Sequence, residues 1–291
     1  MIITITCNPA IDKTVFNNDI SFDVGGKGIN VSKVLNVLNT KSFLTGFLGK
    51  ENKDIVLDDL YRYETDFVLV DGKTRTNTKT IIRHELIEDN EDGPFIDVKY
   101  LKELKDKVSK YYDNIVVISG STPPNVTDTY YQELVSILKQ NNNYVILDAS
   151  KNQLRNAIKS KPNILKPNKD EVCELFNIEY DEELVIQKCK ELINDGIEII
   201  VVSLGKDGSL FINSDSVYKV KPIDVEFRSP VGAGDAMVAG LAYSIENKLP
   251  YEEMIRLSTS LASCAVESLG SKPPVISRVN SLLNSVIMKK N

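Results

Sequence analysis

The chain contains 291 residues, of which 42% are hydrophobic and 26% are charged, the composition of an ordinary folded protein. Its formal net charge of −6 gives no positive field for a nucleic-acid backbone, so nucleic acid is not expected as a partner. The N-terminal residues MIITITCNPA carry no basic leader, and no apolar run approaches the roughly 18 residues of a membrane span. We therefore expect a cytoplasmic protein without a membrane partner, in which any anionic ligand is held by local groups.

Four cysteines and one histidine limit the metal chemistry open to the chain. Cys7, Cys173, Cys189 and Cys264 lie far apart without a C-x-x-C pair, which predicts reduced, packed thiols rather than a zinc site. A site with two imidazole ligands is excluded because His84 is the only histidine. A catalytic base must therefore be sought among the carboxylates.

Short apolar runs alternate with helical patterns through the first two thirds of the chain. Strands are predicted at 2–6, 42–47, 66–70, 115–119, 144–148, 163–165 and 197–203. Helices are predicted at about 27–39, 53–61, 127–140 and 181–195. Because the strands are continuously apolar and separated by amphipathic helices, we expect an α/β fold with a doubly wound, mostly parallel central sheet and helices on both faces.

Two regions depart from this rhythm. Residues 75–97 alternate apolar and polar residues and then reach the turn-like NEDGP, which together with 13–24 predicts a small β lid exposed on one face. The C-terminal third predicts strands around 208–221 and helices at about 233–247, 251–268 and 277–288. Since no repeat or linker interrupts the chain, we expect residues 1–291 to form a single domain.

The segment SPVGAGDAMVAGLA at 229–242 carries the strongest chemical signal. Gly232 and Gly234 flank Ala233 at the start of a predicted helix, where backbone N–H groups and the helix dipole stabilise an anion such as a phosphoryl group in transfer. Asp235 follows directly and is placed to accept a proton from an attacking hydroxyl. The alternative is that Asp235 only caps the helix and the glycines only form a tight turn.

A second glycine cluster, DVGGKGINVSKVL at 23–35, also opens a predicted helix and adds Lys27 and Asn30 to its first turn. Such a helix start suits a polyhydroxylated anionic ligand. A Rossmann dinucleotide motif does not fit, because Val31 stands where the third glycine is required. The cluster therefore favours a polyhydroxylated anion over a nicotinamide dinucleotide.

Two further motifs have both a chemical and a purely structural interpretation. Asn168 and Glu171, in LKPNKDE, lie on one face of a helix start and could orient magnesium-bound water, but N-x-x-E is also a helix-capping box. VVSLGKDGS at 201–209 ends a strand with a glycine-bracketed turn, which suits a nucleotide phosphate or a β-hairpin. Local pattern does not choose between these alternatives.

In this order, the motifs resemble the ribokinase-like (PfkB) family of carbohydrate kinases, from TCNPAID at 6–12 to the C-terminal helices. The resemblance implies an ATP- and Mg²⁺-dependent kinase with a ribokinase-like fold, in which Gly232, Ala233 and Gly234 form the anion hole and Asp235 is the base. It assigns the sugar and its phosphate to Asp12, Gly25, Gly26, Lys27, Asn30 and Arg75. It assigns the nucleotide to Lys166, Asn168, Glu171, Ser203, Gly205 and Gly208, with Asn168 and Glu171 reaching magnesium through water.

Within the family, the N-P-x-x-D start, GGKGINV and KTRTNTK at 73–79 look like kinases of hexose phosphates. Arg75 would then grip the phosphate already present, since a guanidinium binds such a dianion bidentately. The resemblance favours fructose 1-phosphate, converted to fructose 1,6-bisphosphate, over tagatose 6-phosphate. A sugar-phosphate-binding regulator without catalysis is the alternative of a different class.

One departure from the family's pattern concerns the lid. Only twelve residues separate Asp12 from Gly25, where relatives usually carry a longer segment. The resemblance therefore predicts a reduced lid, and it leaves a homodimer held together by lid strands in doubt.

Overall fold

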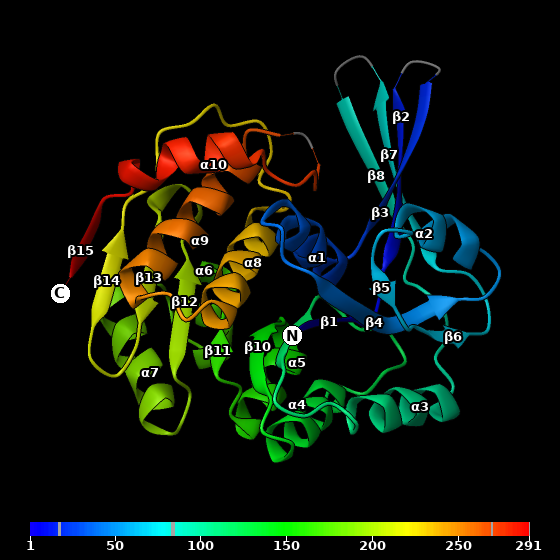
Figure 1. The fold of residues 1–291 in the computed structure, drawn as a ribbon, viewed down its shortest axis with the longest axis horizontal. Helices are drawn as coiled ribbons and strands as arrows, with labels where there is room; N and C mark the ends of the chain where they lie inside the picture. Colours follow the sequence, from blue (N-terminus) through cyan, green and yellow to red (C-terminus); the bar gives the residue numbers. More distant parts are fainter. Residues whose placement is uncertain (17–18, 83–84, 269, 291) are drawn as a thin grey trace.

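The structure is a computed structural model that describes residues 1–16, 19–82, 85–268 and 270–290. Within these residues the chain forms an 11-stranded sheet covered by helices and a separate 4-stranded sheet that projects away from it (Figure 1). The doubly wound α/β architecture and the small β lid expected from the sequence are both confirmed. His84 lies outside the described residues, and the assignment of 1–291 to a single domain stays a prediction.

The main sheet is parallel over most of its strands and antiparallel at one end, in the order β15-β14-β13-β12-β11-β10-β9-β1-β4-β5, with β6 paired to β4. The parallel strands are β1 (Ile2–Thr6), β4 (Ser42–Gly49), β5 (Glu64–Thr65), β6 (Val68–Val70), β9 (Ile115–Ser119), β10 (Tyr144–Asp148), β11 (Ile164–Leu165) and β12 (Ile199–Ser203). β13 (Ser209–Ile212), β14 (Val217–Val220) and β15 (Met288–Lys290) continue the sheet in antiparallel fashion. All parallel strands therefore end at one edge, where their carboxyl-terminal residues meet.

Helices cover both faces of this sheet because its strands are apolar on both sides. One face packs against α3 (Val98–Val108), α4 (Tyr130–Gln140), α5 (Lys151–Ala157), α6 (Lys169–Phe176) and α7 (Glu182–Asn194). The other packs against α1 (Lys27–Val37), α8 (Ala233–Glu246), α9 (Tyr251–Ala265) and α10 (Ile276–Leu282), while α2 (Lys53–Asp59) packs beside α1. The side chains of β1 alternate between the two faces of the sheet: Ile3 and Ile5 pack in the first core, and Ile2 packs in the second.

The lid is the sheet β3-β2-β7-β8, built from β2 (Ala10–Phe16), β3 (Asp19–Gly25), β7 (Arg75–Ile82) and β8 (Glu85–Asn90). Its strands occupy the segments predicted for the lid, although residues 91–97 form no strand. β2 and β3 pair in antiparallel fashion, with Asp12 opposite Asp23 and Ala10 opposite Gly25. The lid's base therefore lies at the start of α1 (Figure 1).

The C-terminal helix is shorter than the sequence pattern predicted. Residues 277–288 were expected to be helical, whereas α10 ends at Leu282, a 3-10 turn spans Leu283–Ser285, and Met288–Lys290 form β15. β15 pairs with β14, placing Met288 opposite Val220. The open edge of β14 supplies backbone partners that local helix preference cannot take into account.

The described residues include all four cysteines. All four cysteines are free thiols, and Cys7, Cys189 and Cys264 are buried. In the described part of the chain, no three His, Cys, Asp or Glu side chains converge in a way that would hold a metal ion directly.

Gly46 permits the closest strand contact beneath the carboxyl-terminal edge of the sheet. It lies opposite Thr6 in the β1–β4 pair, has φ 140°, and a β-carbon there would lie 1.9 Å from the Thr6 carbonyl oxygen. We expect Gly46→Ala to lower the free energy of unfolding by about 3 kcal/mol through strain and overpacking, as measured by urea denaturation.

Gly270→Ala is the matched control, because Gly270 also has positive φ but has nothing within 4 Å of the added carbon. Gly270→Ala should lower the free energy of unfolding by about 1 kcal/mol, the cost of the left-handed conformation alone. If both variants lowered the free energy of unfolding equally, the close contact with Thr6 would add nothing to the effect of Gly46→Ala.

Candidate active site

Two helix N-termini meet at the carboxyl-terminal edge of the sheet, and both begin after a glycine. α1 starts after Gly26, with φ 124°, and α8 starts after Gly232, with φ 84°; neither helix has a side-chain cap at its N-terminus. At Gly26 a β-carbon would lie 2.9 Å from the Thr6 side chain, so the chain can turn into α1 there only without one. The free N–H groups and positive dipole ends of both helices therefore face the same region.

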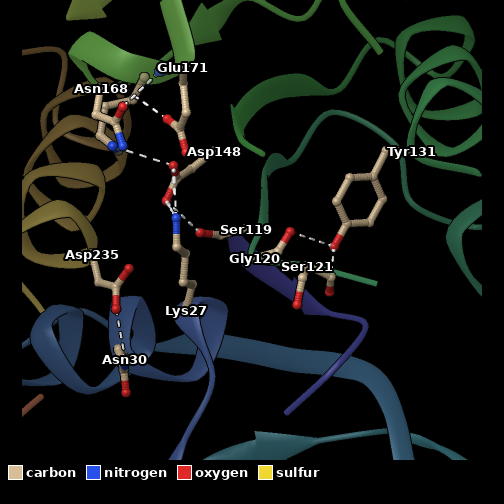
Figure 2. Close-up of polar contacts among 11 residues, drawn as sticks. Lys27, Asn30, Ser119, Gly120, Ser121, Tyr131, Asp148, Asn168, Glu171 and Asp235 are labelled. Atoms are coloured by element: carbon tan, nitrogen blue, oxygen red, sulfur yellow. Dashed lines mark hydrogen bonds and ion pairs between the residues drawn. The ribbon is translucent and has the colours of Figure 1, made fainter. Parts of the chain in front are cut away.

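Asp235 joins these two helices directly. It lies in the first turn of α8 and accepts a 2.8 Å hydrogen bond from Nδ2 of Asn30 in α1, as Figure 2 shows. Only 6% of Asp235 is exposed. Burial, together with the negative charge of Asp148, raises its pKa to about 6, although the hydrogen bond from Asn30 and the charges of Lys27 and Lys166 oppose the shift. Such a carboxylate is a stronger base than an ordinary aspartate and is still ionised near neutral pH.

Asp148 is the buried centre of the site, and the sequence did not single it out. It ends β10 with 0% exposure and accepts a 3.0 Å hydrogen bond from Ser119 at the end of neighbouring β9. Nζ of Lys27 lies 3.2 Å away (Figure 2). Nζ of Lys166 lies 3.3 Å away. Burial alone would raise the pKa of Asp148, but the two ammonium charges hold it below its ordinary value.

Lys166 connects this ion-pair cluster to the start of α8. It is 4% exposed, and its Nζ lies 3.5 Å from the place a β-carbon would take on Gly234. Because Gly234 has no side chain, the ammonium group can approach the N-terminal turn that carries Asp235. The predicted residues Gly232, Ala233, Gly234, Asp235, Lys27, Asn30 and Lys166 thus lie in one continuous site.

Asn168 and Glu171 form the capping box that the sequence offered as an alternative. The Glu171 N–H donates to Oδ1 of Asn168 and the Asn168 N–H donates to Oε2 of Glu171, both at 2.8 Å. This reciprocal pair fixes the start of α6 beside Asp148 (Figure 2). The structural role is therefore present. A role toward a metal stays a prediction that uses Oε1 of Glu171, which capping leaves free, and the second lone pair of Oδ1 of Asn168.

The glycine-bracketed turn at 204–208 joins β12 to β13, with Ser203 bridged to Asn168. Gly208 has φ 94°, and a β-carbon there would lie 2.0 Å from the Val220 carbonyl oxygen, so this glycine is needed by the hairpin itself. Gly205 has φ 59° and open space around it. The turn is therefore a hairpin in which Gly205 is exposed, and its contact with a nucleotide stays a prediction.

The lid contributes a second group of polar residues. Nδ2 of Asn77 in β7 donates a 2.9 Å hydrogen bond to Oδ1 of Asp12 in β2. A β-carbon on Gly25 would lie 2.5 Å from the other Asp12 oxygen, so Gly25 leaves room for this carboxylate. Arg75 lies at the start of β7, and its Nη2 donates to the Asn8 carbonyl oxygen at 3.3 Å.

A cavity of about 190 Å³ lies between the lid and the sheet edge. It is lined by Thr6, Asn8, Gly26, Lys27, Arg75, Gly120, Ser121, Ala149 and Ser150. Two cationic side chains, Lys27 and Arg75, therefore reach one small cavity from opposite elements, as a bound anion requires. The loop residues that follow β9 and β10 were not predicted, although their place after two adjacent buried strands is a signal available in the sequence.

Buried polar atoms without a hydrogen-bond partner among the described residues occur on three residues that line this cavity and on two that bond to Asp235 and Asp12. They are Oγ1 of Thr6, Oδ1 of Asn8, Oδ1 of Asn30, Nε of Arg75 and Oδ1 of Asn77. Buried polar groups are nearly always paired in folded proteins, so unpaired groups that gather in one place indicate a polar ligand. A sugar phosphate, with several hydroxyl groups and one dianion, matches their chemistry.

Comparison with known proteins decides the family. The family described as "pfkB family carbohydrate kinase" matches residues 1–278. This chain belongs to the PfkB family of carbohydrate kinases. It is 33% identical to a 1-phosphofructokinase of Bacillus subtilis, covering 94% of this chain and 95% of the relative. It is 31% identical to a 1-phosphofructokinase of Borreliella burgdorferi, covering 89% and 90%.

Solved structures agree with this assignment. Phosphofructokinase-2 of Escherichia coli, in complex with potassium, superposes with a TM-score of 0.91 at 25% identity, covering 98% of both chains. The same enzyme in complex with fructose-6-phosphate gives a TM-score of 0.88. As a PfkB kinase, the chain is an ATP-dependent sugar kinase. None of the helices in the described part of the chain has the length and apolarity needed to cross a bilayer.

The raised pKa of Asp235 predicts that ionisation of this side chain lowers the free energy of unfolding of this PfkB kinase. An aspartate with pKa 3.8 in the unfolded chain and about 6 in the fold binds its proton more tightly when folded, so stability falls as pH rises between these values. Asp235→Asn removes that cost. We expect the variant to be more stable than wild type by about 2 to 3 kcal/mol at pH 7.5, with the difference vanishing near pH 4, as measured by urea denaturation.

Asp148→Asn is the control within the same pocket, and we expect the opposite sign. It removes the partner of Lys27 and Lys166, and breaking a buried ion pair costs about 3 kcal/mol or more. A lower free energy of unfolding for Asp235→Asn at pH 7.5 would contradict the prediction, because it would mean that the ionised Asp235 does not destabilise the fold.

Proposed function

We propose that this PfkB kinase transfers the γ-phosphoryl group of ATP to the C6 hydroxyl of fructose 1-phosphate, giving fructose 1,6-bisphosphate and ADP. The observation that carries the proposal is the buried Asp235 at the open N-terminus of α8, bonded to Asn30 of the same helix whose Lys27 lines the cavity with Arg75. The two relatives named 1-phosphofructokinase support the choice of sugar.

Asp235 acts as the general base in this proposal. As the C6 oxygen attacks the γ-phosphorus, its proton passes to the Asp235 carboxylate, and the bond from the γ-phosphorus to the bridging oxygen of ADP breaks. The hydrogen bond from Asn30 holds the carboxylate in place and leaves its other oxygen to receive the proton. A pKa of about 6 matches this task at neutral pH.

The start of α8 stabilises the charge on the transferring group. Gly232 and Gly234 present backbone N–H groups that no side chain caps, and the helix dipole adds to their field. The Ala233 N–H donates a 3.4 Å hydrogen bond to the Pro230 carbonyl oxygen, so its part in the proposed anion hole requires that this long bond be exchanged for one to the phosphoryl group. The Lys166 ammonium group lies against Gly234 and adds a positive charge on the nucleotide side. Phosphoryl transfer relies mainly on such positioning and electrostatic stabilisation.

Binding of the phosphate already on the sugar is assigned to Arg75 and Lys27, which share the cavity. Sugar hydroxyl groups are assigned to Asp12, Asn30 and the backbone at Gly25 and Gly26. Asn77 joins this group because it holds Asp12 and has an unpaired oxygen of its own. These assignments place the sugar between the lid and the start of α1.

Magnesium is proposed as the metal that accompanies ATP. Since no direct cluster of metal-binding side chains occurs in the residues that the structure describes, the fit is to an ion carried by nucleotide phosphates and water. Glu171 and Asn168 would orient that water through their oxygen atoms at the start of α6. When bound, the ion neutralises the phosphate charge. The nucleotide itself is assigned to Ser203, Gly205 and Gly208.

A homodimer, which the short lid segment left in doubt, has one observation in its favour. Ile20 and Phe22 on the edge strand β3 are 55% and 58% exposed. An apolar sheet edge of this kind favours contact with a second copy of the chain.

The decisive experiment measures ADP release with fructose 1-phosphate, tagatose 6-phosphate, fructose 6-phosphate and unphosphorylated fructose. We expect the highest kcat/KM for fructose 1-phosphate, and a fall in kcat/KM below about pH 6 as Asp235 takes up its proton. Asp235→Asn should lower kcat by about a thousandfold with little change in KM. A higher kcat/KM for another ketohexose phosphate would show that the proposed substrate is wrong, but would leave the role of Asp235 as base unaffected. Wild-type turnover in Asp235→Asn would refute the mechanism.

The metal proposal predicts a specific effect at Glu171. Removal of divalent ions by EDTA should abolish turnover, and added Mg²⁺ should restore it. Glu171→Gln keeps a capping-box residue but removes the charge, so we expect an about tenfold higher Mg²⁺ concentration for half-maximal rate. Glu174→Gln, on the exposed side of the same helix, is the control. If both variants needed the same Mg²⁺ concentration for half-maximal rate, Glu171 would have no role in the proposed metal site.

A further inference from the structure

Asn8 connects three parts of the site that lie far apart in the sequence. It follows β1, is 6% exposed, and its Nδ2 donates a 3.1 Å hydrogen bond to the Asp92 carbonyl oxygen. Its own carbonyl oxygen accepts from Nη2 of Arg75 at 3.3 Å. One residue thus binds both the turn that follows the lid and the guanidinium group that reaches the cavity.

The turn at 91–93 fits closely against the Asn8 side chain. Gly93 has φ 106°, and a β-carbon there would lie 2.4 Å from Oδ1 of Asn8. Glu91 fastens the other end of the turn, because its side chain accepts from the Thr76 N–H at 2.8 Å and pairs with Lys73 at 2.9 Å. The turn is therefore held at both ends, and Asn8 supplies the attachment nearest the cavity.

Arg75 is held by backbone carbonyl groups rather than by a carboxylate. Its Nη1 donates to the Glu91 carbonyl oxygen at 3.5 Å, and its Nη2 donates to Asn8. Among the described residues no ion pair to Arg75 is formed within 4.0 Å, so its charge is not neutralised by a contacting partner. Its Nε is buried without a hydrogen bond. A guanidinium oriented in this way keeps its charge for a ligand in the cavity.

We propose that Asn8 is a positioning residue that fixes where the existing phosphate of the substrate binds, by fastening the 91–93 turn and, with it, the Arg75 guanidinium. This inference rests on the proposed function, because it concerns the phosphate of a sugar-phosphate substrate. With the phosphate fixed at Arg75, the far hydroxymethyl group is the part of the sugar left to reach Asp235. Asn8 thereby contributes to the choice of which end of the sugar is phosphorylated.

The test is a double-mutant cycle between Asn8 and Arg75. Asn8→Ala removes the Nδ2 hydrogen bond to the Asp92 carbonyl, which holds the turn whose Glu91 carbonyl accepts from Arg75, while the Asn8 backbone carbonyl stays in place. We expect the Kd of fructose 1-phosphate to rise about tenfold as the turn loosens and Arg75 loses its orientation. The KM for ATP should stay within about twofold of wild type, and the preference for fructose 1-phosphate over unphosphorylated fructose should narrow by about tenfold. In the Arg75→Ala background, Asn8→Ala should have little further effect on sugar binding, because the 91–93 turn then has no guanidinium to orient.

Two further variants separate positioning from folding. Asn8→Leu keeps the volume of the side chain but removes the amide, and should behave like Asn8→Ala. Asn125→Ala is the matched control: Asn125 holds the next segment in the same manner, donating to the Ile96 carbonyl at 2.8 Å and accepting from the Ile96 N–H at 3.0 Å. It does not line the cavity and should leave sugar binding unchanged.

The outcomes distinguish this inference from the proposed function. Calorimetric binding and turnover are measured with each phosphorylated ketohexose of the panel, and the cycle uses whichever of these binds most tightly to wild type. If that sugar is not fructose 1-phosphate, the proposed substrate is wrong, while coupling between Asn8 and Arg75 still supports positioning. Additive effects of Asn8→Ala and Arg75→Ala, an equal rise in the KM for ATP, or the same loss in Asn125→Ala would overturn the role of Asn8.

Discussion

The ion pairs of Asp148 with Lys27 and Lys166 connect the two sides of the site. These residues come from the end of β10, the start of α1 and the link between β11 and α6, so the cluster ties together separate segments of the chain. A fully buried carboxylate is costly unless cations and hydrogen bonds compensate it, and here two ammonium groups and Ser119 do so. In return, Asp148 keeps Lys27 at the cavity and Lys166 against the first turn of α8.

The same buried charge influences the proposed base. Asp148 is a negative neighbour of Asp235, and together with burial it makes ionisation of Asp235 costly. Part of the fold's stability is therefore given up to obtain a carboxylate that binds protons well near neutral pH, a common trade at catalytic sites. The unpaired polar atoms of Thr6, Asn30 and Asn77 follow the same logic, because a ligand can supply the hydrogen bonds that the protein leaves unmade.

Backbone geometry explains why glycines occur at the boundaries of this site. Gly26 and Gly232 allow α1 and α8 to begin with open N-termini, while Gly25 and Gly234 leave room for the Asp12 carboxylate and the Lys166 ammonium group. Gly208 differs, because its close contact with the Val220 carbonyl serves the β12–β13 hairpin. Glycine is thus needed near the proposed ligand at some positions, and is needed for close backbone packing at Gly208.

The sequence by itself determined the doubly wound sheet, the helices that open after glycine, and the placement of Asp235 in the first turn of one of them. These features follow from local periodicity and from backbone conformations that only certain residues adopt. Tertiary structure alone decided that Asp148 is the shared partner of Lys27 and Lys166 and that Asn77 orients Asp12, because these contacts depend on which strand ends become neighbours. It likewise decided that residues 288–290 form a strand, since the partner edge at β14 lies about 70 residues away in the chain. Short-range patterns record what one segment prefers, whereas a buried charge or an edge strand is stable only once the distant segment that pairs with it is in place.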